Sequence, residues 1–345
     1  MYTQNSGYGQ AILNMVSQMV PTFGRIFIVC SPSDVAKENY LRMQEICKSD
    51  PDGQLRFFGT NGYDDSTPLE QAYAAATTNN NDVILLDANT VHKVTTQISW
   101  SKSRVHLIGM DGGGRFTEQG ARIQTAVGAA VASVVKVTGT RNSFRNIKFV
   151  QNDTNAAAIN VVISAGSSTL WQNCSFIFEV TDNLDLTTAC EVLIGEAGGT
   201  FDKCVFGNDC ILSSAARSVT TLDTVTGSAS SDSAKHNTFR DCMWTIQSSS
   251  ASAKFFSVAD TAGAKFRNTL INPVFQAVVN ATNSAVILTA TMASVSGLVE
   301  GNILVVNPAT NCTDLCTTSD NVKAVGSSMN GGADTAYVGI GIVPA

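Results

Sequence analysis

Charged side chains are scarce in this chain. Asp, Glu, Lys and Arg make up 14% of its 345 residues, whereas an ordinary globular domain has roughly 25%. The net charge is −6, and no segment gathers enough Lys and Arg to form the basic patch that binding to a phosphate backbone requires. We therefore do not expect nucleic acid to be a direct partner.

Long apolar runs are missing as well. The apolar segment near the N-terminus, residues 11–20, is much shorter than the roughly 20 apolar residues of a membrane span. It also lacks the positively charged segment that begins a secretory signal, because the first basic residue is Arg25. We expect no membrane partner, and a soluble chain that is made in the cytoplasm.

The possible metal ligands have unfavourable spacings. No CxxC pair occurs among the nine cysteines, and their odd number argues against a complete disulfide framework. Cys312 and Cys316 have three residues between them, but no neighbouring His or second Cys pair completes a zinc set, so a disulfide or two buried thiols remain as alternatives. The histidines, far apart in the sequence, are His92, His106 and His236. We expect reduced, mostly buried cysteines, and neither a metal nor a cofactor.

What the chain does have is a six-residue motif that recurs five times. Its first residue is aromatic, its second and third are polar or charged, its fourth is Ile, Cys or Thr, and its sixth is Phe, Trp or Ile. The first residues of successive copies are 27, 30, 38 and 27 positions apart. The copies are FRNIKF (144–149), WQNCSF (171–176), FDKCVF (201–206), FRDCMW (239–244) and FRNTLI (266–271).

Repeats of this length are typical of a solenoid, in which one repeat cannot bury its apolar face alone. We predict an all-β fold, a right-handed parallel β-helix, in which like residues of successive coils stack along the axis. The first positions then form a core ladder of Phe144, Trp171, Phe201, Phe239 and Phe266, and the fourth positions form a row of Ile147, Cys174, Cys204, Cys242 and Thr269. Simple alternation would place position one on the opposite face from positions four and six, so we expect a bend within the motif.

The pattern divides the chain into four parts. We predict an N-terminal arm at residues 1–20, an α/β cap at 21–81, the β-helix at 82–278 and a β-rich oligomerisation region at 279–345. The spacing of 38 places an insertion within residues 213–233. Beyond residue 278 the motif disappears, and we expect antiparallel or subunit-exchanging strands there.

Helical patterns are confined to the N-terminal parts. Residues 33–48 predict one helix, and a capping box at Thr67, Pro68 and Glu70 predicts the start of another that covers the first coil. In the arm, five apolar residues share one helical face: Ile12, Met15, Val16, Met19 and Val20. They indicate either a further helix on the same cap or an assembly segment that docks on another subunit.

Catalytic candidates are limited to acidic residues, because a β-helix often carries polysaccharide lyases and glycoside hydrolases, and a hydrolase needs two carboxylates roughly 5–10 Å apart. Asp182 and Asp185 are the best local pair among Asp182, Asp185, Glu191, Asp202, Asp209, Asp223 and Asp232. We favour the interpretation of these acidic residues as solvated turn residues. The glycine-rich segment MDGGGR at residues 110–115 is interpreted as a turn rather than a phosphate loop. We therefore predict no catalytic residues and no enzymatic activity.

The order of the parts resembles head-associated structural proteins of tailed phages that contain right-handed parallel β-helix repeats. The resemblance covers roughly residues 20–150, and it is carried by GRIFIVC (24–30), TPLEQAYAAA (67–76) and DVILLDANTVHKVTTQISWSKSRVHLIG (82–109). The last of these segments has the form that opens many β-helix proteins, including lyases and tailspikes. The resemblance implies a multicopy, trimeric cement or decoration protein on the capsid, with no catalytic residues to carry over.

From the resemblance we expect a phage virion protein that decorates the capsid exterior and stabilises the head through intersubunit contacts. Its partners would be further copies of itself, as a homotrimer, and the major capsid protein. The alternative is a tailspike-like protein that binds or cleaves carbohydrate along the outer face of the β-helix.

Overall fold

The computed structural model describes most of the chain. The described residues are 2–31, 37–50, 54–59, 65–87, 91–110, 120–180, 185–223, 234–250, 253–258, 266–279, 286–290, 296–300, 304–306 and 322–325. Within them no helix is long and apolar enough to cross a bilayer. Cys312 and Cys316 and the turn at residues 111–115 lie outside these ranges.

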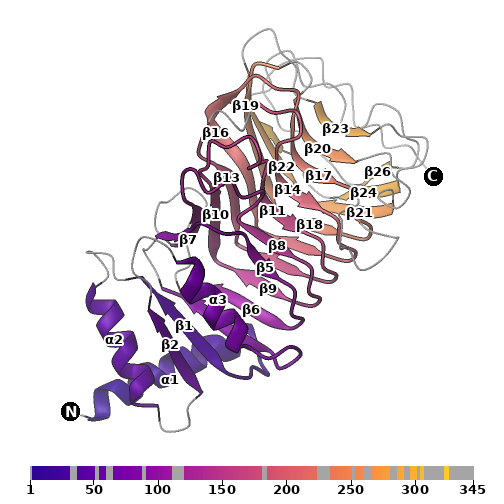
Figure 1. Cartoon of the computed structure of the whole chain (residues 1–345). Helices are drawn as coiled ribbons and strands as arrows, with labels where there is room; N and C mark the ends of the chain where they lie inside the picture. Colours follow the sequence, from indigo (N-terminus) through magenta and orange to yellow (C-terminus); the bar gives the residue numbers. More distant parts are fainter. Residues whose placement is uncertain are drawn as a thin grey trace.

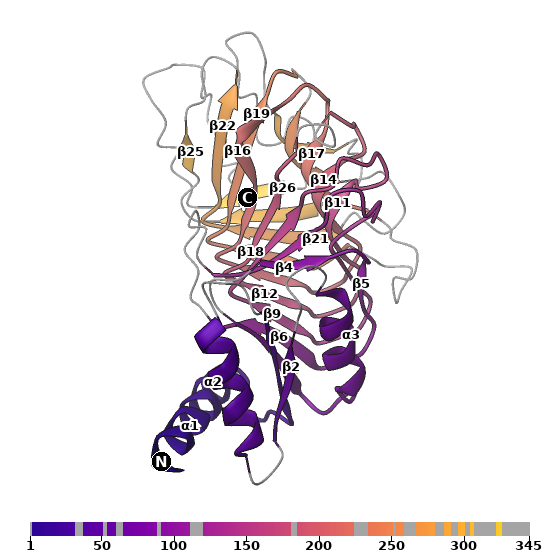
Figure 2. The ribbon, with the colours of Figure 1, turned by 60° about the vertical axis from the view of Figure 1, so that its left-hand side comes forward.

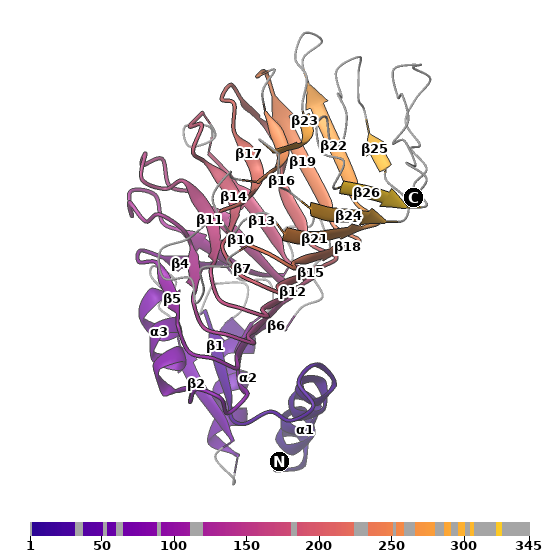
Figure 3. The same cartoon turned by 90° about the vertical axis from the view of Figure 1, so that its right-hand side faces the viewer.

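The described strands form three parallel sheets that wind around one axis (Figures 1 and 3). Sheet A consists of β2 (Leu55–Gly59), β1 (Ile26–Cys30), β3 (Asp82–Leu86), β6 (Val105–Gly109), β9 (Ser143–Arg145), β12 (Leu170–Gln172), β15 (Thr200–Asp202), β18 (Thr238–Arg240), β21 (Phe266–Ile271), β24 (Ser296–Glu300) and β26 (Val322–Val325). Sheet B consists of β4 (Val91–Val94), β7 (Ala121–Thr125), β10 (Ile147–Gln151), β13 (Ser175–Phe178), β16 (Val205–Ser213), β19 (Met243–Ser248), β22 (Val274–Val279) and β25 (Leu304–Val306). Sheet C consists of β5 (Ile98–Trp100), β8 (Val135–Val137), β11 (Asn160–Ser164), β14 (Cys190–Ile194), β17 (Ser218–Leu222), β20 (Lys254–Val258) and β23 (Val286–Ala290). The chain is a right-handed parallel β-helix, as the repeat predicts.

The bend inside the motif is a single residue. The third residue of each in-register copy has a positive φ: Asn146 (59°), Asn173 (52°), Lys203 (55°), Asp241 (50°) and Asn272 (48°). This left-handed conformation turns the chain from sheet A into sheet B within one position, and Asn and Asp tolerate it better than most residues do. Because the bend interrupts the alternation, motif positions one, four and six all point into the core.

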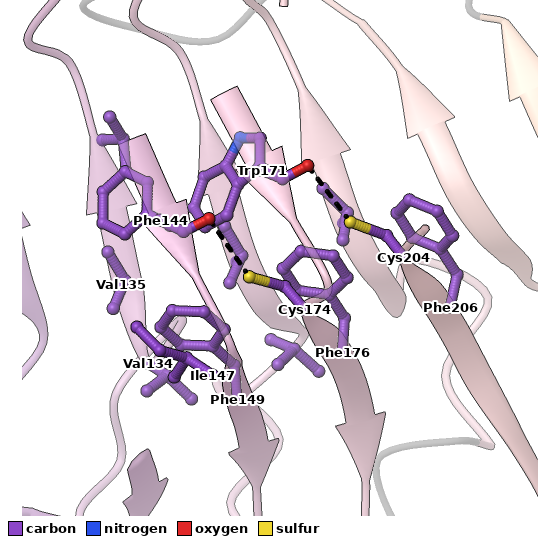
Figure 4. Close-up of a cluster of buried hydrophobic side chains, with 14 of the residues drawn as sticks. Val134, Val135, Phe144, Ile147, Phe149, Trp171, Cys174, Phe176, Cys204 and Phe206 are labelled. Carbon is purple, nitrogen blue, oxygen red and sulfur yellow. Dashed lines mark hydrogen bonds between the residues drawn. The ribbon is translucent and has the colours of Figure 1, made fainter. Parts of the chain in front are cut away.

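Inside the bend, aromatic rings stack from coil to coil (Figure 4). Phe144 and Trp171 lie 4.2 Å apart between ring centroids, Trp171 and Phe201 6.1 Å, and Phe201 and Phe239 4.9 Å, with interplanar angles of 12°, 6° and 9°. A second stack follows position six through Phe149, Phe176, Phe206, Trp244 and Phe275. The two stacks meet edge to face, the geometry that aromatic quadrupoles favour.

The ladder continues through a residue that the motif alignment misses. Phe239 pairs in register with Leu270, not with Phe266, so the predicted fifth ladder residue is wrong. In the correct register the copy begins at Leu270, the bend falls at Asn272, and buried Pro273 replaces Thr269 at position four. The sequence alignment chose Phe266 because it is aromatic, whereas the residue that continues the ladder, Leu270, is aliphatic.

The cysteines at position four form a row of buried thiols. Cys174 Sγ donates to the carbonyl oxygen of Phe144 (3.4 Å), and Cys204 Sγ donates to that of Trp171 (3.4 Å), as Figure 4 shows. Cys242 repeats this contact one coil later, with Phe201 (3.3 Å). All three are free thiols, and burial raises the pKa of Cys204 well above its ordinary value. They pack as small apolar residues.

The N-terminal helices cover different parts of the β-helix. The helices are α1 (Tyr2–Met19), α2 (Lys37–Lys48) and α3 (Ser66–Ala75). Figure 2 shows α1 and α2 together at the N-terminal end. Ile12, Val16 and Val20 pack against the outer face of β1 and β3, and Met15 and Met19 lie around the same cluster. The five apolar residues of the predicted arm therefore belong to the cap of their own chain.

Helix α3 packs against β1 and β2 of sheet A and β5 of sheet C, and the residue at its N-cap bonds to β4 of sheet B. It starts one residue before the predicted capping box, with Asp65 at the N-cap and no side-chain capping bond, so the capping-box assignment to Thr67 is wrong. The Asp65 side chain instead accepts from the backbone N–H of Lys93 on β4 (3.0 Å). At the other end, Lys102 Nζ donates to the carbonyl of Ala76 (2.7 Å) and so caps the helix C-terminus.

Beyond residue 278 the coils continue. β23, β24 and β25 pair in parallel with β20, β21 and β22, and β26 pairs in parallel with β24. The expected antiparallel or exchanged strands are therefore not found among the described residues. The motif disappears there because the aromatic pattern ends, while the β-branched residues that suit parallel strands continue.

We expect Phe201→Ala to lower the free energy of unfolding by about 3–5 kcal/mol, because it leaves a void in a column packed on both sides. The matched control is Thr200→Ala on the outer face of β15, which should change that free energy by less than about 0.5 kcal/mol. Urea unfolding followed by circular dichroism measures both. Equal losses would contradict the inward position of Phe201.

Candidate functional site

One ion pair lies inside the core. Arg217 Nη1 lies 2.7 Å from Glu191 Oε2, and both side chains are fully buried. The strand register places Glu191 in the column of Val161 and Val219, two residues of the apolar core. Burial raises the pKa of Glu191, and the charge of Arg217 opposes that effect. The pair joins two successive coils. Because solvent does not reach either side chain, neither is placed to contact a substrate.

A second buried acid, Glu196, completes a ladder of side chains at the corner between sheets C and A. The other members are asparagines whose Oδ1 accepts a backbone N–H of the preceding coil: Asn142 from Val105, Asn237 from Gly199 and Asn268 from Asn237. In the remaining coil Glu196 Oε2 accepts from Thr169 N (3.1 Å). A Cβ on Gly199 would lie 2.6 Å from Glu196 Cδ, so glycine makes the room for this carboxyl group. Burial raises the pKa of Glu196.

His92 belongs to the joint between the cap and the first coil. Its Nε2 lies 2.8 Å from Asp87 Oδ1, and its Nδ1 lies 3.6 Å from Asp65 Oδ2. Asp87 also accepts from the backbone N–H of Ser31, which follows β1. The group therefore connects β1, β4 and the start of α3, and solvent does not reach the imidazole. Its position indicates a structural role.

Of the acidic pair that the sequence offers, only Asp185 lies among the described residues. Asp182 and Asp232 lie outside the described residues, as does the side chain of Asp209. Asp185 Oδ1 accepts from the backbone N–H and the hydroxyl of Ser214 at 2.7 and 3.0 Å, and so braces the next turn. Half-buried Asp223 follows β17, and exposed His236 lies in a turn with φ of 57°. Among the candidate acids that the structure describes, only Asp202 lies on an accessible sheet face beside other polar groups.

Asp202 belongs to a row that we call the polar face: Arg145, Gln172, Asp202 and Arg240, on the outer side of β9, β12, β15 and β18. Arg145 Nη1 donates to Gln172 Oε1 (2.8 Å), and Gln172 Nε2 donates to Asp202 Oδ2 (2.8 Å). Arg240 is exposed and the other three are half-buried. Together they present guanidinium, amide and carboxylate planes at the coil spacing of about 4.8 Å.

The polar face begins where the cap ends. One coil earlier the same column is occupied by Ile108, which is buried in the apolar cluster beneath α1. The bend residues add a second polar row beside the first, in which Asn173 Nδ2 donates to Asn146 Oδ1 (3.0 Å) and Asn272 Nδ2 donates to Asp241 Oδ1 (3.0 Å). Motif positions two and three, which are polar in the first four copies, are the sequence signal of these rows. In the correct register of the fifth copy, position two is Ile271.

His106 lies at the N-terminal border of the polar face. Its Nδ1 lies 2.7 Å from Ser143 Oγ. Burial, with a smaller contribution from the charge of Arg145, lowers the pKa of His106 to about 4. The imidazole is therefore neutral at pH 7, and it positions the start of β9 rather than ligating a metal. Among the described residues no three His, Cys, Asp or Glu side chains gather as a metal site.

Comparison with known proteins gives the fold alone. No protein-family model matches the chain, and no curated protein sequence is similar to it. A solved pectin methylesterase mutant in complex with a hexasaccharide has a TM-score of 0.48 and 11% identity, with 91% of each chain covered. A pectate lyase has a TM-score of 0.43 and 11% identity, covering 88% of this chain and 80% of its own. The Dettilon tailspike protein has a TM-score of 0.38 and 10% identity, covering 81% and 51%.

These structures correct one expectation. We predicted no enzymatic activity because the sequence shows no catalytic set, yet the similar folds include a pectin methylesterase and a pectate lyase. The prediction that the chain has no enzymatic activity is therefore wrong, because this architecture is also that of enzymes. Residues far apart in sequence meet on one face of a β-helix, so the missing sequence motif carried no information about activity.

We expect Glu191→Gln to destabilise the fold by about 3–5 kcal/mol, because it leaves the Arg217 guanidinium buried without its counter-charge. The double variant Glu191→Val with Arg217→Met should recover most of that loss, since it removes both charges. Urea unfolding compares the two. A double variant as unstable as the single one would contradict the ion pair as the cause.

His106 should make the fold sensitive to acid. Its folded pKa of about 4 lies below the unfolded value of about 6.5, so between these values the unfolded chain binds a proton that the folded chain does not. The free energy of unfolding should therefore fall as the pH falls from 6.5 to 4. We expect His106→Gln to lose less stability than the wild type between pH 7 and 4.5 in urea unfolding. Equal losses would exclude His106 as the titrating group.

Proposed function

We propose that this chain is a carbohydrate-binding β-helix protein, and that its ligand is a linear polysaccharide lying along the polar face. The observation that carries the proposal is the hydrogen-bonded row from Arg145 through Gln172 to Asp202, with exposed Arg240 next along the axis. A linear glycan also presents hydroxyl groups at a regular interval, and each hydroxyl both donates and accepts. The regular spacing of the coils therefore suits a polymer better than a compact ligand.

The chemistry of these side chains supports the same ligand. Guanidinium, amide and carboxylate groups offer several donors and acceptors in one plane, so each can bind two neighbouring hydroxyls. They stand on rigid strands, and their mutual hydrogen bonds hold them in place before a ligand arrives. The side chains of the polar face therefore lose little conformational entropy when a glycan binds, which favours affinity. The row contains two cations and one carboxylate, so it accepts neutral sugars as well as those with a carboxylate.

The role of a capsid decoration protein stays a prediction from the sequence resemblance. So do the homotrimer, the major capsid protein as a partner and the location on the virion. None of the contacts described above distinguishes such a protein from other β-helix proteins, whereas the polar face is a specific feature that the carbohydrate ligand explains.

Affinity electrophoresis against a panel of neutral and acidic polysaccharides tests the proposal. We expect Gln172→Ala and Asp202→Ala each to weaken binding about tenfold, the loss expected when a hydrogen bond worth about 1.5 kcal/mol is removed. The matched control is Lys136→Ala, a half-buried residue on the outer face of sheet C, which should leave binding unchanged. Thermal unfolding must show all three variants folded.

Two outcomes would count against the proposal. Equal losses in the control and in the face variants would place the ligand elsewhere, and no retardation by any glycan of the panel would exclude carbohydrate binding. An assay of reducing ends on the same panel reports whether the bound glycan is also hydrolysed.

A further inference from the structure

The three sheets begin at three edge strands, and two of these edges are closed. On β4, the backbone carbonyl of Lys93 accepts from Asp65 N (2.5 Å), and the backbone N–H of Thr95 just beyond the strand donates to Ser66 Oγ (2.8 Å). At β5, α3 packs against the strand, and Tyr73 Oη accepts the backbone N–H of Lys102, two residues beyond its end. Free strand edges promote association, and here the residues around α3 cover both of them.

The third edge strand, β2, differs from these two. Its partner β1 lies on one side, and Ile26 N donates to the carbonyl of Gln54 (2.8 Å). In a parallel pair the backbone groups alternate in direction, so those of Arg56 face β1 and those of Phe57 and Gly59 face away from it. No described strand lies along that outer side, since β2 is the last strand of sheet A.

The open side of β2 is partly occupied already. Leu55 N donates to Asp50 Oδ2 (2.7 Å), so this N–H is taken while the Leu55 carbonyl still faces outward. The groups that remain are the N–H and carbonyl of Phe57, the N–H and carbonyl of Gly59 and the carbonyl of Leu55. Apart from the Gly59 carbonyl, this set is symmetric about Phe57.

We propose that β2 pairs in antiparallel fashion with β2 of a second copy of this chain, across a twofold axis at Phe57. Because both backbone groups of Phe57 face outward, the two copies of this residue can exchange two hydrogen bonds. Gly59 N–H then meets the free carbonyl of Leu55 in the other copy. The Leu55 N–H is already bonded to Asp50, so the Gly59 carbonyl opposite it makes no bond in this register. A twofold axis requires such a self-complementary pattern.

Charge and apolar contacts favour the same occupant. In this register exposed Arg56 lies opposite Phe58 of the second copy, so the like charges do not face each other across the pair. The Phe57 ring packs edge to face on Tyr40, with centroids 5.0 Å apart. Leu41, half exposed on α2, adds an apolar group on the helix that packs against β2. This inference does not depend on carbohydrate binding, because the polar face lies at other strands.

Disulfide trapping tests the register directly. The Cα atoms of a hydrogen-bonded antiparallel pair lie about 5.5 Å apart, within the range of about 4.4–6.8 Å that a disulfide spans. We expect Phe57→Cys to form a covalent dimer under mild copper-phenanthroline oxidation. The matched control, Arg56→Cys, and the wild type should stay monomeric on a non-reducing gel. Equal crosslinking in all three, or none in Phe57→Cys, would overturn the proposed register.

A second measurement uses the unmodified chain. Light scattering should give twice the chain mass for the wild type, and Phe57→Pro, which removes the outward N–H, should give the mass of one chain. Should the proline variant fail to fold, hydrogen exchange replaces it: the Phe57 and Gly59 amides of the wild type should lose protection on dilution while that of Arg56 keeps it. A wild type that is monomeric at every concentration, or a dimer whose Phe57 amide exchanges freely, overturns the proposal.

Discussion

The aromatic core and the polar face of this protein depend on the single left-handed residue that turns the chain from sheet A into sheet B. Five of these bends stack, from Asn146 to Asn272, and each fixes the relative position of one strand in sheet A and one in sheet B. Successive coils therefore superpose without slippage along this corner. The aromatic stacks, the thiol row and the polar face are three consequences of that one register. A strand shifted by one residue would move its apolar set to the outside and break all three.

The fold could be predicted from the sequence because the repeat combines spacing with chemistry. A coil-length interval with an aromatic residue, two polar residues and a cysteine is specific for a stacked strand. What the spacing could not supply was the true register of the last copy. Phe266 satisfies the pattern, but the bend at Asn272 shows that Leu270 occupies the ladder. An aliphatic residue can fill an aromatic column, so side-chain type is a weaker guide there than backbone conformation.

The candidate site was less predictable, for a different reason. Gln172 and Arg240 are ordinary surface residues in sequence, and their alignment on one face appears only when coils 30 or more residues apart are stacked. Conversely, Glu191 was among the candidate acids, but the structure buries it, as it buries Glu196, in a role that holds coils together. A carboxylate in a solenoid sequence can face the core, a turn or solvent, and the local sequence does not distinguish these positions.

From β9 to β22, one or two residues separate each strand of sheet A from the next strand of sheet B, and one of them is left-handed. The other two corners vary widely in length and include the long connection after β17. These coils therefore have one edge of nearly constant geometry and two edges that accept added residues. Sequence drift and engineered insertions have room at the variable corners, where each new loop changes the local surface and leaves the stacking intact. In the coils from β9 to β22, a residue added at this edge would break the register of the ladder residues in the coil that carries it.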